Sequence, residues 1–255
     1  MTINPFDLSG KTALVTGSSR GLGFVMARGL ARAGARIILN GVNADRLQTA
    51  QTSLKHEGLE AQTLNFDVTN EADVIAAFAL LDRRDMAPDI LINNAGIQVR
   101  KPLLDFTSDE WRKVIDTNLT SAFVIGREAA RRMVARGHGK IINIGSLASE
   151  LARPTVAPYT AAKGGIKMLT RSMAVEWAAK GLQVNGIGPG YMLTDMNQAL
   201  MDNAEFNAWL MGRVPAKRWG KPEELAGAAV FLASSASDYI NGQMIYIDGG
   251  MLAAM

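Results

Sequence analysis

Short apolar runs alternate with longer amphipathic runs along this 255-residue chain, and the alternation constrains the fold more than any other feature. The short runs predict buried strands at residues 11–16, 36–40, 61–66, 89–92, 140–144, 183–187 and 244–247. The longer runs predict helices at residues 24–33, 44–57, 71–84, 110–136, 158–179 and 222–234. Strands that alternate with helices form a mostly parallel sheet with helices on both faces. We therefore expect one α/β domain over residues 1–255, a doubly wound sheet of about seven strands.

The residue content excludes several kinds of chemistry. Because the chain has no cysteine, disulfides, thiolate catalysis and cysteine-based metal sites are excluded. His56 and His138 lie far apart among polar residues, so we expect neither a metal centre nor a histidine-based triad. The net charge of +3 is small and the basic residues are scattered, which suits anionic small ligands but not a nucleic-acid surface.

The chain shows no pattern of membrane insertion or export. No apolar run reaches the ~18 residues of a membrane span. The first residues, MTINPFDLSGK, lack the basic and apolar regions of a secretory signal. Hydrophobic residues make up 48% and charged residues 20%, as in a soluble globular protein. We expect a cytoplasmic protein that acts on a small molecule and binds neither membrane nor nucleic acid.

A glycine-rich turn follows the first predicted strand. Residues 17–23 read GSSRGLG, with the spacing G-x-x-x-G-x-G in place of the standard G-x-G-x-x-G. Glycines in a strand-to-helix turn let the backbone approach a phosphate, and the helix N-terminus attracts its charge. The alternative is a tight turn without a ligand. The strand–turn–helix context favours a nucleotide site in a Rossmann-like fold.

Polar and glycine-containing motifs follow several other predicted strands. They are the pair at 67–68, NNAG at 93–96, Ser146, and GPG at 188–190. Ligands of parallel sheets bind at the carboxyl ends of the strands, so these motifs predict one active-site cleft. Asn118 lies among apolar neighbours in the longest predicted helix. A buried asparagine must find hydrogen-bond partners, so it is either a structural bridge or part of a polar relay.

Tyr159 and Lys163 lie four residues apart at the start of the predicted helix 158–179 and therefore share one face. An ammonium group beside a phenol favours the phenolate, so we expect Lys163 to lower the pKa of Tyr159. The phenol can then donate and accept a proton near neutral pH. Ser146, at the end of the preceding strand, can hydrogen-bond a substrate oxygen. The alternative for the tyrosine–lysine pair is ordinary helix surface.

Together these motifs resemble those of the classical short-chain dehydrogenase/reductase family, over nearly the whole chain. The matching pieces are TGSSRGLG at 16–23, Asp67-Val68, NNAG at 93–96, Asn118, Ser146, YTAAK at 159–163, and PG followed by Thr194. The resemblance implies a nicotinamide coenzyme and hydride transfer to or from a carbinol carbon.

The resemblance also implies a role for each catalytic residue. Tyr159 is the proton donor in reduction and the base in oxidation. Lys163 lowers the pKa of Tyr159 and holds the nicotinamide ribose. Ser146 orients the substrate oxygen, and Asn118 anchors a water that leads protons out.

The coenzyme contacts follow from the same resemblance. The pyrophosphate lies over the glycine-rich turn, Asp67 and Val68 lie beside the adenine, and Met192 and Thr194 contact the carboxamide. The full expected set is Gly17, Ser19, Arg20, Gly21, Leu22, Gly23, Asn40, Gly41, Asp67, Val68, Asn94, Ala95, Gly96, Tyr159, Lys163, Pro189, Gly190, Met192 and Thr194.

The end of the second predicted strand bears on the choice of nicotinamide. An NAD enzyme carries an acidic residue there, whereas Asn40 and Gly41 are neutral. Arg20 stands where NADP-using members of the family place a basic residue. Val42 replaces a second arginine that often follows this strand. We expect NADP(H) in preference to NAD(H).

Within the family, the chain resembles gluconate 5-dehydrogenases. The matching segments are GIQVRKPLLDF at 96–106, SEL at 149–151, VNGIGPGYMLTDM at 184–196, RWG at 218–220, and the ending YIDGGMLA. This implies reversible oxidation of a sugar acid such as gluconate to its 5-keto form. Arg100 and Arg153 are candidates to bind the carboxylate, and Glu150 to accept hydrogen bonds from hydroxyls. The alternative for each of the three is a solvated loop charge.

Two other functions stay open from the sequence. One is a 3-oxoacyl-carrier-protein reductase or another ketone reductase of the same family, which would share the catalytic and coenzyme residues. The other is a non-catalytic dinucleotide-binding sensor.

Two further segments carry expectations. Residues 191–214 are polar and methionine-rich without an obvious fixed scaffold, which predicts a mobile lid over the cleft. Gly164 and Gly165 fall inside the predicted helix 158–179, where a glycine costs about 1 kcal/mol relative to alanine. In the family that helix packs closely on a symmetry mate, so we expect a homotetramer.

Overall fold

Seven parallel strands form the central sheet of the computed structural model, which describes residues 4–254. Residues 1–3 and 255 of the predicted domain therefore lie outside the described residues. The strand order is β3-β2-β1-β4-β5-β6-β7. The strands are β1 Thr12–Val15, β2 Arg36–Gly41, β3 Ala61–Asn65, β4 Ile90–Asn93, β5 Gly139–Ile144, β6 Leu182–Pro189 and β7 Met244–Ile247. This confirms the predicted doubly wound parallel sheet.

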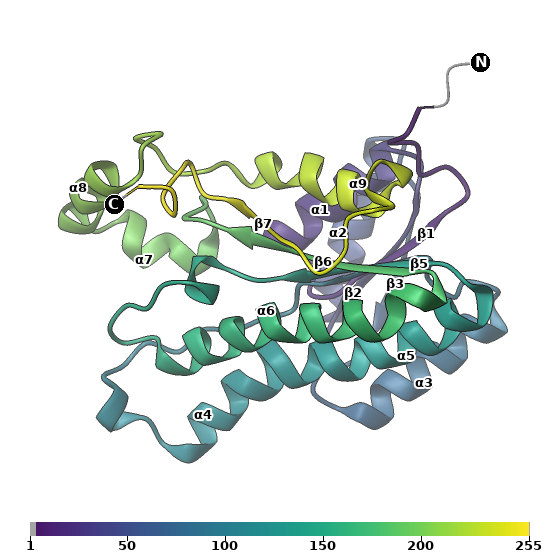
Figure 1. Cartoon of the computed structure of the whole chain (residues 1–255), viewed down its shortest axis with the longest axis horizontal. Helices are drawn as coiled ribbons and strands as arrows, with labels where there is room; N and C mark the ends of the chain where they lie inside the picture. The colour runs from purple at the N-terminus through teal and green to yellow at the C-terminus, as the bar shows by residue number, and fades with distance from the viewer. Residues whose placement is uncertain (1–3, 255) are drawn as a thin grey trace.

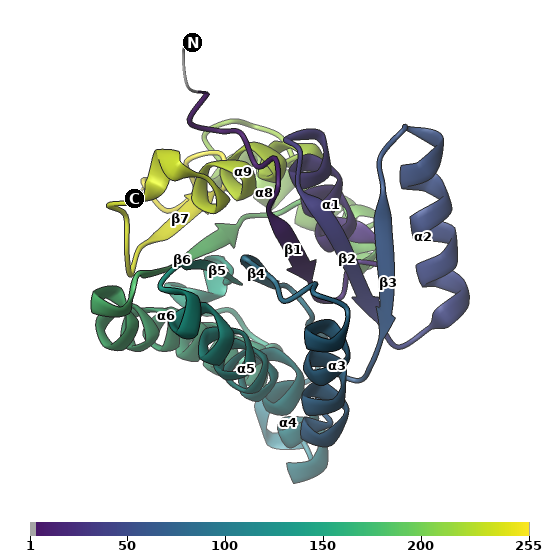
Figure 2. The ribbon, with the colours of Figure 1, turned by 90° about the vertical axis from the view of Figure 1, so that its right-hand side faces the viewer.

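Helices cover both faces of the sheet (Figures 1 and 2). On one side lie α1 and α9, with α2 beside β2 and β3, and on the other lie α3, α5 and α6. The helices are α1 Gly21–Arg32, α2 Ala44–His56, α3 Glu71–Arg83, α4 Ser108–Ile115, α5 Ser121–Arg136, α6 Ala157–Trp177, α7 Gln198–Met201, α8 Ala204–Arg213 and α9 Ala226–Ala233. Short single turns are η1 Leu103–Asp105, η2 Asp116–Thr120, η3 Leu147–Ser149, η4 Ala178–Lys180, η5 Asp195–Asn197, η6 Pro222–Leu225 and η7 Ser235–Ser237.

The strands are continuous apolar runs because both of their faces are buried. In β1, Val15 faces the core under α1 and α9, whereas the adjacent Leu14 faces the core under α3 and α5. Their partners across the β1–β2 ladder, Leu39 and Ile38, divide between the same two cores. The side-chain period of two residues thus supplies both hydrophobic layers from each strand.

The long helix expected over residues 110–136 is interrupted. Its first part, α4, begins at Ser108 behind the capping residue Thr107, whose side chain accepts from the backbone N–H of Glu110. A π-helical turn, η2, then separates α4 from α5. This turn carries Asn118, and such turns are frequently found at functional sites.

Gly165 has a packing role inside the chain. A Cβ at this position would lie 2.7 Å from Cδ2 of Leu119 in η2, so a larger residue would require the Leu119 side chain to move. The neighbouring Gly164 has no atom within 4 Å of the corresponding position. The small size of Gly165 is therefore explained without a symmetry mate.

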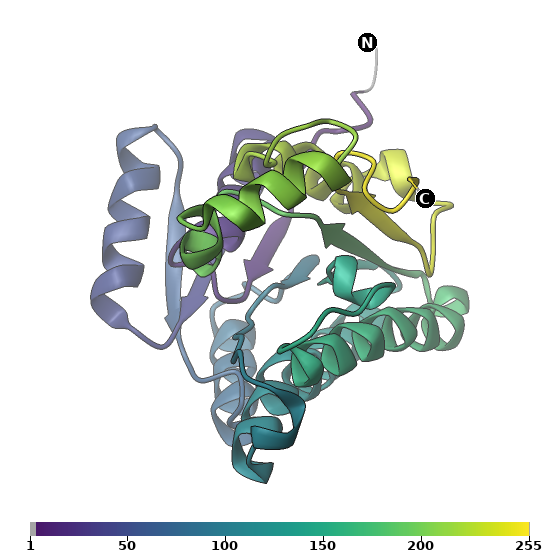
Figure 3. The ribbon, with the colours of Figure 1, turned by 90° about the vertical axis from the view of Figure 1, so that its left-hand side faces the viewer.

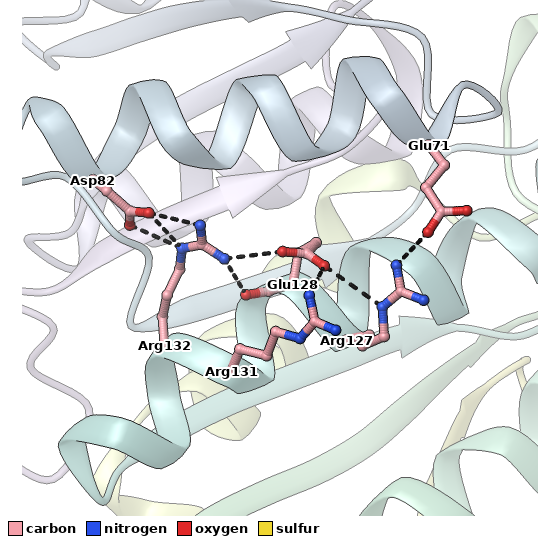
Figure 4. A network of polar contacts seen from close by, with 6 residues as sticks. All are labelled: Glu71, Asp82, Arg127, Glu128, Arg131 and Arg132. Carbon is pink, nitrogen blue, oxygen red and sulfur yellow. Dashed lines mark hydrogen bonds and ion pairs between the residues drawn. The ribbon is translucent and has the colours of Figure 1, made fainter.

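A buried carboxylate, Glu128, joins α5 to α3 (Figure 4). Its side chain is 4% exposed and accepts hydrogen bonds from Arg131 at 2.8 Å and from Arg132 at 3.1 Å. Arg132 also donates hydrogen bonds from Nε and Nη2 to the carboxylate of Asp82 in α3. The network pairs each buried charge, as the cost of burying an ion requires.

The carboxyl ends of the strands all point to one edge of the sheet, where α7 and α8 lie in front of them (Figure 3). The polar segments predicted to follow the strands are gathered at this edge. Within residues 4–254, no helix combines the length and apolar character needed to cross a bilayer.

Candidate active site

A cavity of about 1350 Å³ opens at the carboxyl edge of the sheet. It collects nearly all of the predicted site residues. These are Gly17, Ser19, Arg20, Gly21, Leu22, Gly23, Asn40, Gly41, Asp67, Val68, Asn94, Ala95, Gly96, Arg100, Ser146, Arg153, Tyr159, Lys163, Pro189, Gly190, Met192 and Thr194. Asn118 and Glu150 are the two predicted residues that do not line it.

The glycine-rich turn forms a cradle at one end of the cavity. Gly17 and Gly21 have φ values of +60° and +59°, a region that side chains with a Cβ rarely adopt. A Cβ at Gly21 would meet no atom within 4 Å, whereas one at Gly23 would lie 2.6 Å from the carbonyl oxygen of Gly17. No side chain caps the N-terminus of α1, whose free N–H groups suit a phosphate. The turn therefore fits a dinucleotide pyrophosphate.

Two asparagines hold this cradle in place. Asn94 donates through its side chain to the carbonyl oxygens of Thr16 at 2.9 Å and Gly17 at 3.1 Å. Asn40 is fully buried, and its amide accepts from the N–H of Gly17 and donates to carbonyls at the end of β3. Asn40 therefore uses its side chain to connect β1, β2 and β3.

Few charged side chains are free for a ligand beside the cradle, where the adenosine of the coenzyme is expected. Asp67 turns its carboxylate back to accept from the N–H and hydroxyl of Thr69, both at 2.8 Å. Val42 is 69% exposed and lines the cavity directly after Gly41. Arg20, on the glycine-rich turn itself, also lines the cavity, and its guanidinium is paired with Asp195.

Ser146, Tyr159 and Lys163 meet in the middle of the cavity. Ser146 follows β5, and its hydroxyl accepts from the N–H of Ala148 at 3.1 Å and also hydrogen-bonds Tyr159. Lys163 is buried in α6 and donates from Nζ to the carbonyl oxygen of Ile144 at 2.6 Å. Its Nζ lies 5.6 Å from the centre of the Tyr159 ring.

The expected lowering of the Tyr159 pKa is wrong. Burial raises the pKa of Tyr159 above its ordinary value, and the hydrogen bond with Ser146 and the charge of Arg100 only partly oppose this. Lys163 is not among the groups that lower this pKa, and its Nζ donates to the carbonyl oxygen of Ile144. Burial also lowers the pKa of Lys163 to about 8.

Arg100 and Arg153 bring two guanidinium groups to the other end of the cavity. Nη1 of Arg100 is buried and has no hydrogen-bond partner within residues 4–254. Burial, and next the charge of Arg153, lower the pKa of Arg100. Unpaired buried donors are costly, so this nitrogen indicates a place for an anionic ligand.

Glu150 points away from the cavity. Its carboxylate pairs with Lys167 of α6 and accepts from the hydroxyl of Tyr246 at 2.5 Å. These bonds connect the segment after η3 to α6 and β7. The expectation that Glu150 binds substrate hydroxyls is therefore wrong, because its carboxylate is bonded to Lys167 and Tyr246 on neighbouring elements.

Asn118 is a structural bridge. Its amide oxygen accepts from the N–H of Ile97 at 2.7 Å, and its Nδ2 donates to the carbonyl oxygen of Ile97 at 2.8 Å. Asn118 thereby fixes the segment that follows β4 and leads to Arg100. The sequence left Asn118 as either a structural bridge or part of a polar relay, and its hydrogen bonds are those of a structural bridge.

The segment 191–214 contains more scaffold than its composition suggests. It forms η5, α7 and α8 and contributes three members of an aromatic cluster, namely Tyr191, Phe206 and Trp209, which Trp219 completes. Arg153 donates to the hydroxyl of Tyr191 at 3.3 Å and lies 5.2 Å from the centre of the Phe206 ring. The aromatic cluster therefore holds this guanidinium at the cavity.

Sequence reasoning missed several residues that line the cavity. Among them are Lys113, Tyr191, Trp209, Arg213 and Met251. The position of Tyr191 directly after the GPG motif was an available signal. The others come from α4, α8 and the C-terminal segment, whose approach to the cavity depends on tertiary packing.

The described residues contain no cluster of three or more histidine, aspartate or glutamate side chains that could hold a metal ion. The cavity wall offers a phenol, a serine hydroxyl, ammonium, guanidinium and carboxylate groups, and a glycine-rich turn.

Comparison with known proteins agrees with this arrangement. Residues 17–252 match the family model described as enoyl-(acyl carrier protein) reductase. The chain is 53% identical to a gluconate 5-dehydrogenase of Gluconobacter oxydans and 49% identical to a 5-keto-D-gluconate 5-reductase of Escherichia coli, in each case over 98% of both chains. A crystal structure of a gluconate 5-dehydrogenase from Burkholderia cenocepacia, in complex with NADP and tartrate, is 50% identical, with 98% of each chain covered and a TM-score of 0.96. The chain therefore belongs to the short-chain dehydrogenase/reductase family of oxidoreductases.

Proposed function

We propose that this enzyme reversibly oxidises a sugar acid at a secondary alcohol, with NADP(H) as the preferred coenzyme and gluconate and its 5-keto form as the substrate pair. The names of its relatives support this assignment. The observation that carries it is the buried, unpartnered Nη1 of Arg100 in the same cavity as Ser146 and Tyr159. A guanidinium in that position supplies the charge that a sugar acid needs and a neutral alcohol does not.

The catalytic proton is assigned to Tyr159. Oxidation of the alcohol removes a hydride from carbon and a proton from oxygen, and the nicotinamide coenzyme supplies the hydride acceptor. The phenolate of Tyr159 takes the proton, and in the reverse direction the phenol returns it to the carbonyl oxygen. Ser146, hydrogen-bonded to Tyr159, orients the substrate oxygen between the two hydroxyls.

Lys163 and Asn118 support this reaction. The buried ammonium of Lys163 lies over the Tyr159 ring and is oriented by the carbonyl of Ile144. We assign Lys163 to the nicotinamide ribose. Its ammonium group has no acceptor atom and would donate the hydrogen bond. Asn118 is assigned a positioning role through Ile97. A water relay at this residue would use the second N–H or lone pair of its amide.

The preference for NADP(H) rests on charge at the adenosine end. Gly41 ends β2 without the carboxylate that NAD enzymes use to bind the ribose hydroxyls. Arg20 lies on the glycine-rich turn and lines the cavity, where its guanidinium can bind a 2′-phosphate. A higher kcat/KM with NAD than with NADP would refute this preference.

Arg100 and Arg153 form the proposed carboxylate site. Both guanidinium groups line the cavity, and the charge of Arg153 lowers the pKa of Arg100. Two cations held close together repel, and an anion between them removes the repulsion. Arg153 is held by Tyr191 and Phe206, so carboxylate binding and the position of residues 191–214 are linked.

Three further expectations are part of the proposal. Residues 191–214 act as a lid, which is supported by the contribution of Met192, Trp209 and Arg213 to the cavity wall. The assembly is a homotetramer, which light scattering of the purified protein tests. The location is cytoplasmic, which cell fractionation tests.

A substrate panel tests the function. Gluconate, its 5-keto form, neutral polyols and a 3-oxoacyl thioester are compared with both coenzymes by following the nicotinamide absorbance. The highest kcat/KM is expected for gluconate and its 5-keto form. Preference for the thioester would instead assign a 3-oxoacyl-carrier-protein reductase.

Replacement of Tyr159 by phenylalanine tests the catalytic assignment separately. The change removes only the hydroxyl, and we expect turnover to fall by about 10²–10⁴. Near-normal turnover of this variant, with coenzyme binding intact by fluorescence titration, would refute the role of Tyr159. Coenzyme binding without turnover in the unmodified protein would assign a dinucleotide sensor.

A further inference from the structure

An ion pair bridges the two sides of the coenzyme end of the cavity. Nη1 of Arg20, on the glycine-rich turn, lies 2.8 Å from Oδ2 of Asp195, at the start of η5. The two residues are 175 positions apart in sequence, and both line the cavity. Their side chains are 62% and 76% exposed, so the pair sits at the rim in contact with water. The pair is therefore easily broken by a competing ligand.

Arg20 also lines the cavity next to a residue that packs on the end of β2. Its neighbour Ser19 packs on Gly41, because a Cβ at Gly41 would lie 3.4 Å from the Ser19 hydroxyl oxygen. The other described cations that line the cavity come from later segments. They are Arg100, Lys113, Arg153, Lys163 and Arg213. A phosphate on the adenosine ribose, which lies at the end of this strand, therefore has Arg20 as its cavity-lining cation.

We propose that Asp195 is a coenzyme-specificity residue that weakens the binding of NADP(H) relative to NAD(H). The inference rests on the proposed use of NADP(H). Asp195 already compensates the charge of Arg20, so a 2′-phosphate must either displace the carboxylate or share one guanidinium with it. Both arrangements place two anions around one cation, and the repulsion between them opposes binding. NAD(H) lacks this phosphate and does not compete for Arg20.

The expected size follows from the exposure of the pair. An exposed ion pair contributes at most ~1 kcal/mol, which equals about fivefold in a dissociation constant at 1.4 kcal/mol per tenfold. Replacing Asp195 by asparagine keeps the shape of the side chain and removes its charge. We expect the dissociation constant of NADPH to fall by about two- to fivefold and that of NADH to stay unchanged.

The experiment measures the dissociation constants of NADPH and NADH by fluorescence titration in four variants. They are Asp195→Asn, Arg20→Ala, the double variant, and the control Asp202→Asn. The control removes the same charge from the same segment, at the end of α7, where Asp202 contacts Gln198 and does not line the cavity. The ratio of the two constants cancels any general effect of a loosened segment 191–214, because both coenzymes experience it equally.

The outcomes separate this inference from the proposed coenzyme preference. Arg20→Ala should weaken NADPH by about tenfold, and Asp195→Asn should have no effect in that background. If Arg20→Ala leaves NADPH binding unchanged, the proposed preference for NADP(H) fails. If Arg20→Ala weakens NADPH but Asp195→Asn leaves the ratio unchanged or shifts it toward NADH, Asp195 orients Arg20 or is neutral. That result overturns the inference while the coenzyme preference stands.

Discussion

Replacing Arg100 by methionine should make the protein more stable and less active toward acids. Methionine keeps most of the length of the side chain but removes a guanidinium whose Nη1 is buried without a partner among the described residues. A buried unsatisfied donor costs ~1–3 kcal/mol, and we take the lower end because the rest of the side chain is partly exposed. A gain of ~1 kcal/mol corresponds to a Tm increase of about 2–4 °C for a protein of this size.

The same substitution removes the proposed contact with the substrate carboxylate. A hydrogen bond to a charged group contributes ~1.5–3 kcal/mol, so kcat/KM for gluconate should fall by about 10- to 150-fold. Loss of the Arg100 charge also raises the pKa of Tyr159 further, since that charge lowers it in the native protein. This second effect acts on every substrate.

The assay separates the two effects by a ratio. The kcat/KM for gluconate is divided by that for a neutral polyol at the same pH, so that the common effect on Tyr159 cancels. Arg100→Lys serves as the control, because it keeps a charge but loses the bidentate geometry, and it should give an intermediate ratio. The reasoning is refuted if acid and neutral substrates lose activity equally, or if Arg100→Met lowers Tm.

Three further predictions follow from the geometry. Because burial raises the pKa of Tyr159, kcat/KM for alcohol oxidation should rise with pH through and beyond the neutral range, whereas a rate independent of pH there would contradict the assignment. Glu128→Ala leaves Arg131 and Arg132 without their buried partner and should lower the unfolding free energy in urea by ~3 kcal/mol, with Arg131→Ala, at an exposed arginine, costing ~1 kcal/mol or less. Gly23→Ala places a Cβ against Asn94 and Gly17 and should abolish coenzyme binding in a fluorescence titration, whereas unchanged binding would show that the turn can shift.

The fold and the centre of the site could be predicted because both depend on short-range patterns. The strand runs around Val15 and Ile92 are apolar on both faces, which itself indicates a covered parallel sheet. The four-residue spacing placed Tyr159 and Lys163 on one helix face and the strand pattern placed Ser146 at a strand end, and the family resemblance implied that the three act together. Element boundaries were harder where glycine occurs, as at Gly21, because its low helix propensity hides the first turn of α1.

The failures concern side chains whose partners lie far away in sequence. Glu150 was expected at the substrate, but Lys167 and Tyr246 bind it on another surface. The raised pKa of Tyr159 depends on how deeply this residue is buried in the folded chain. The four-residue spacing of Tyr159 and Lys163 does not reveal that burial.

The order of residues therefore determined the sheet and the glycine-rich turn, because backbone periodicity and glycine geometry are properties of local sequence, and the resemblance of its motifs to a known family implied the type of reaction. Only the tertiary structure decided which charged side chains lie close to one another. Arg20 and Asp195 are 175 residues apart, and Asn118 of η2 bonds to Ile97 in the segment that leads from β4 to Arg100. Electrostatic energy depends on distance and burial in space, and those quantities exist only after the chain has folded.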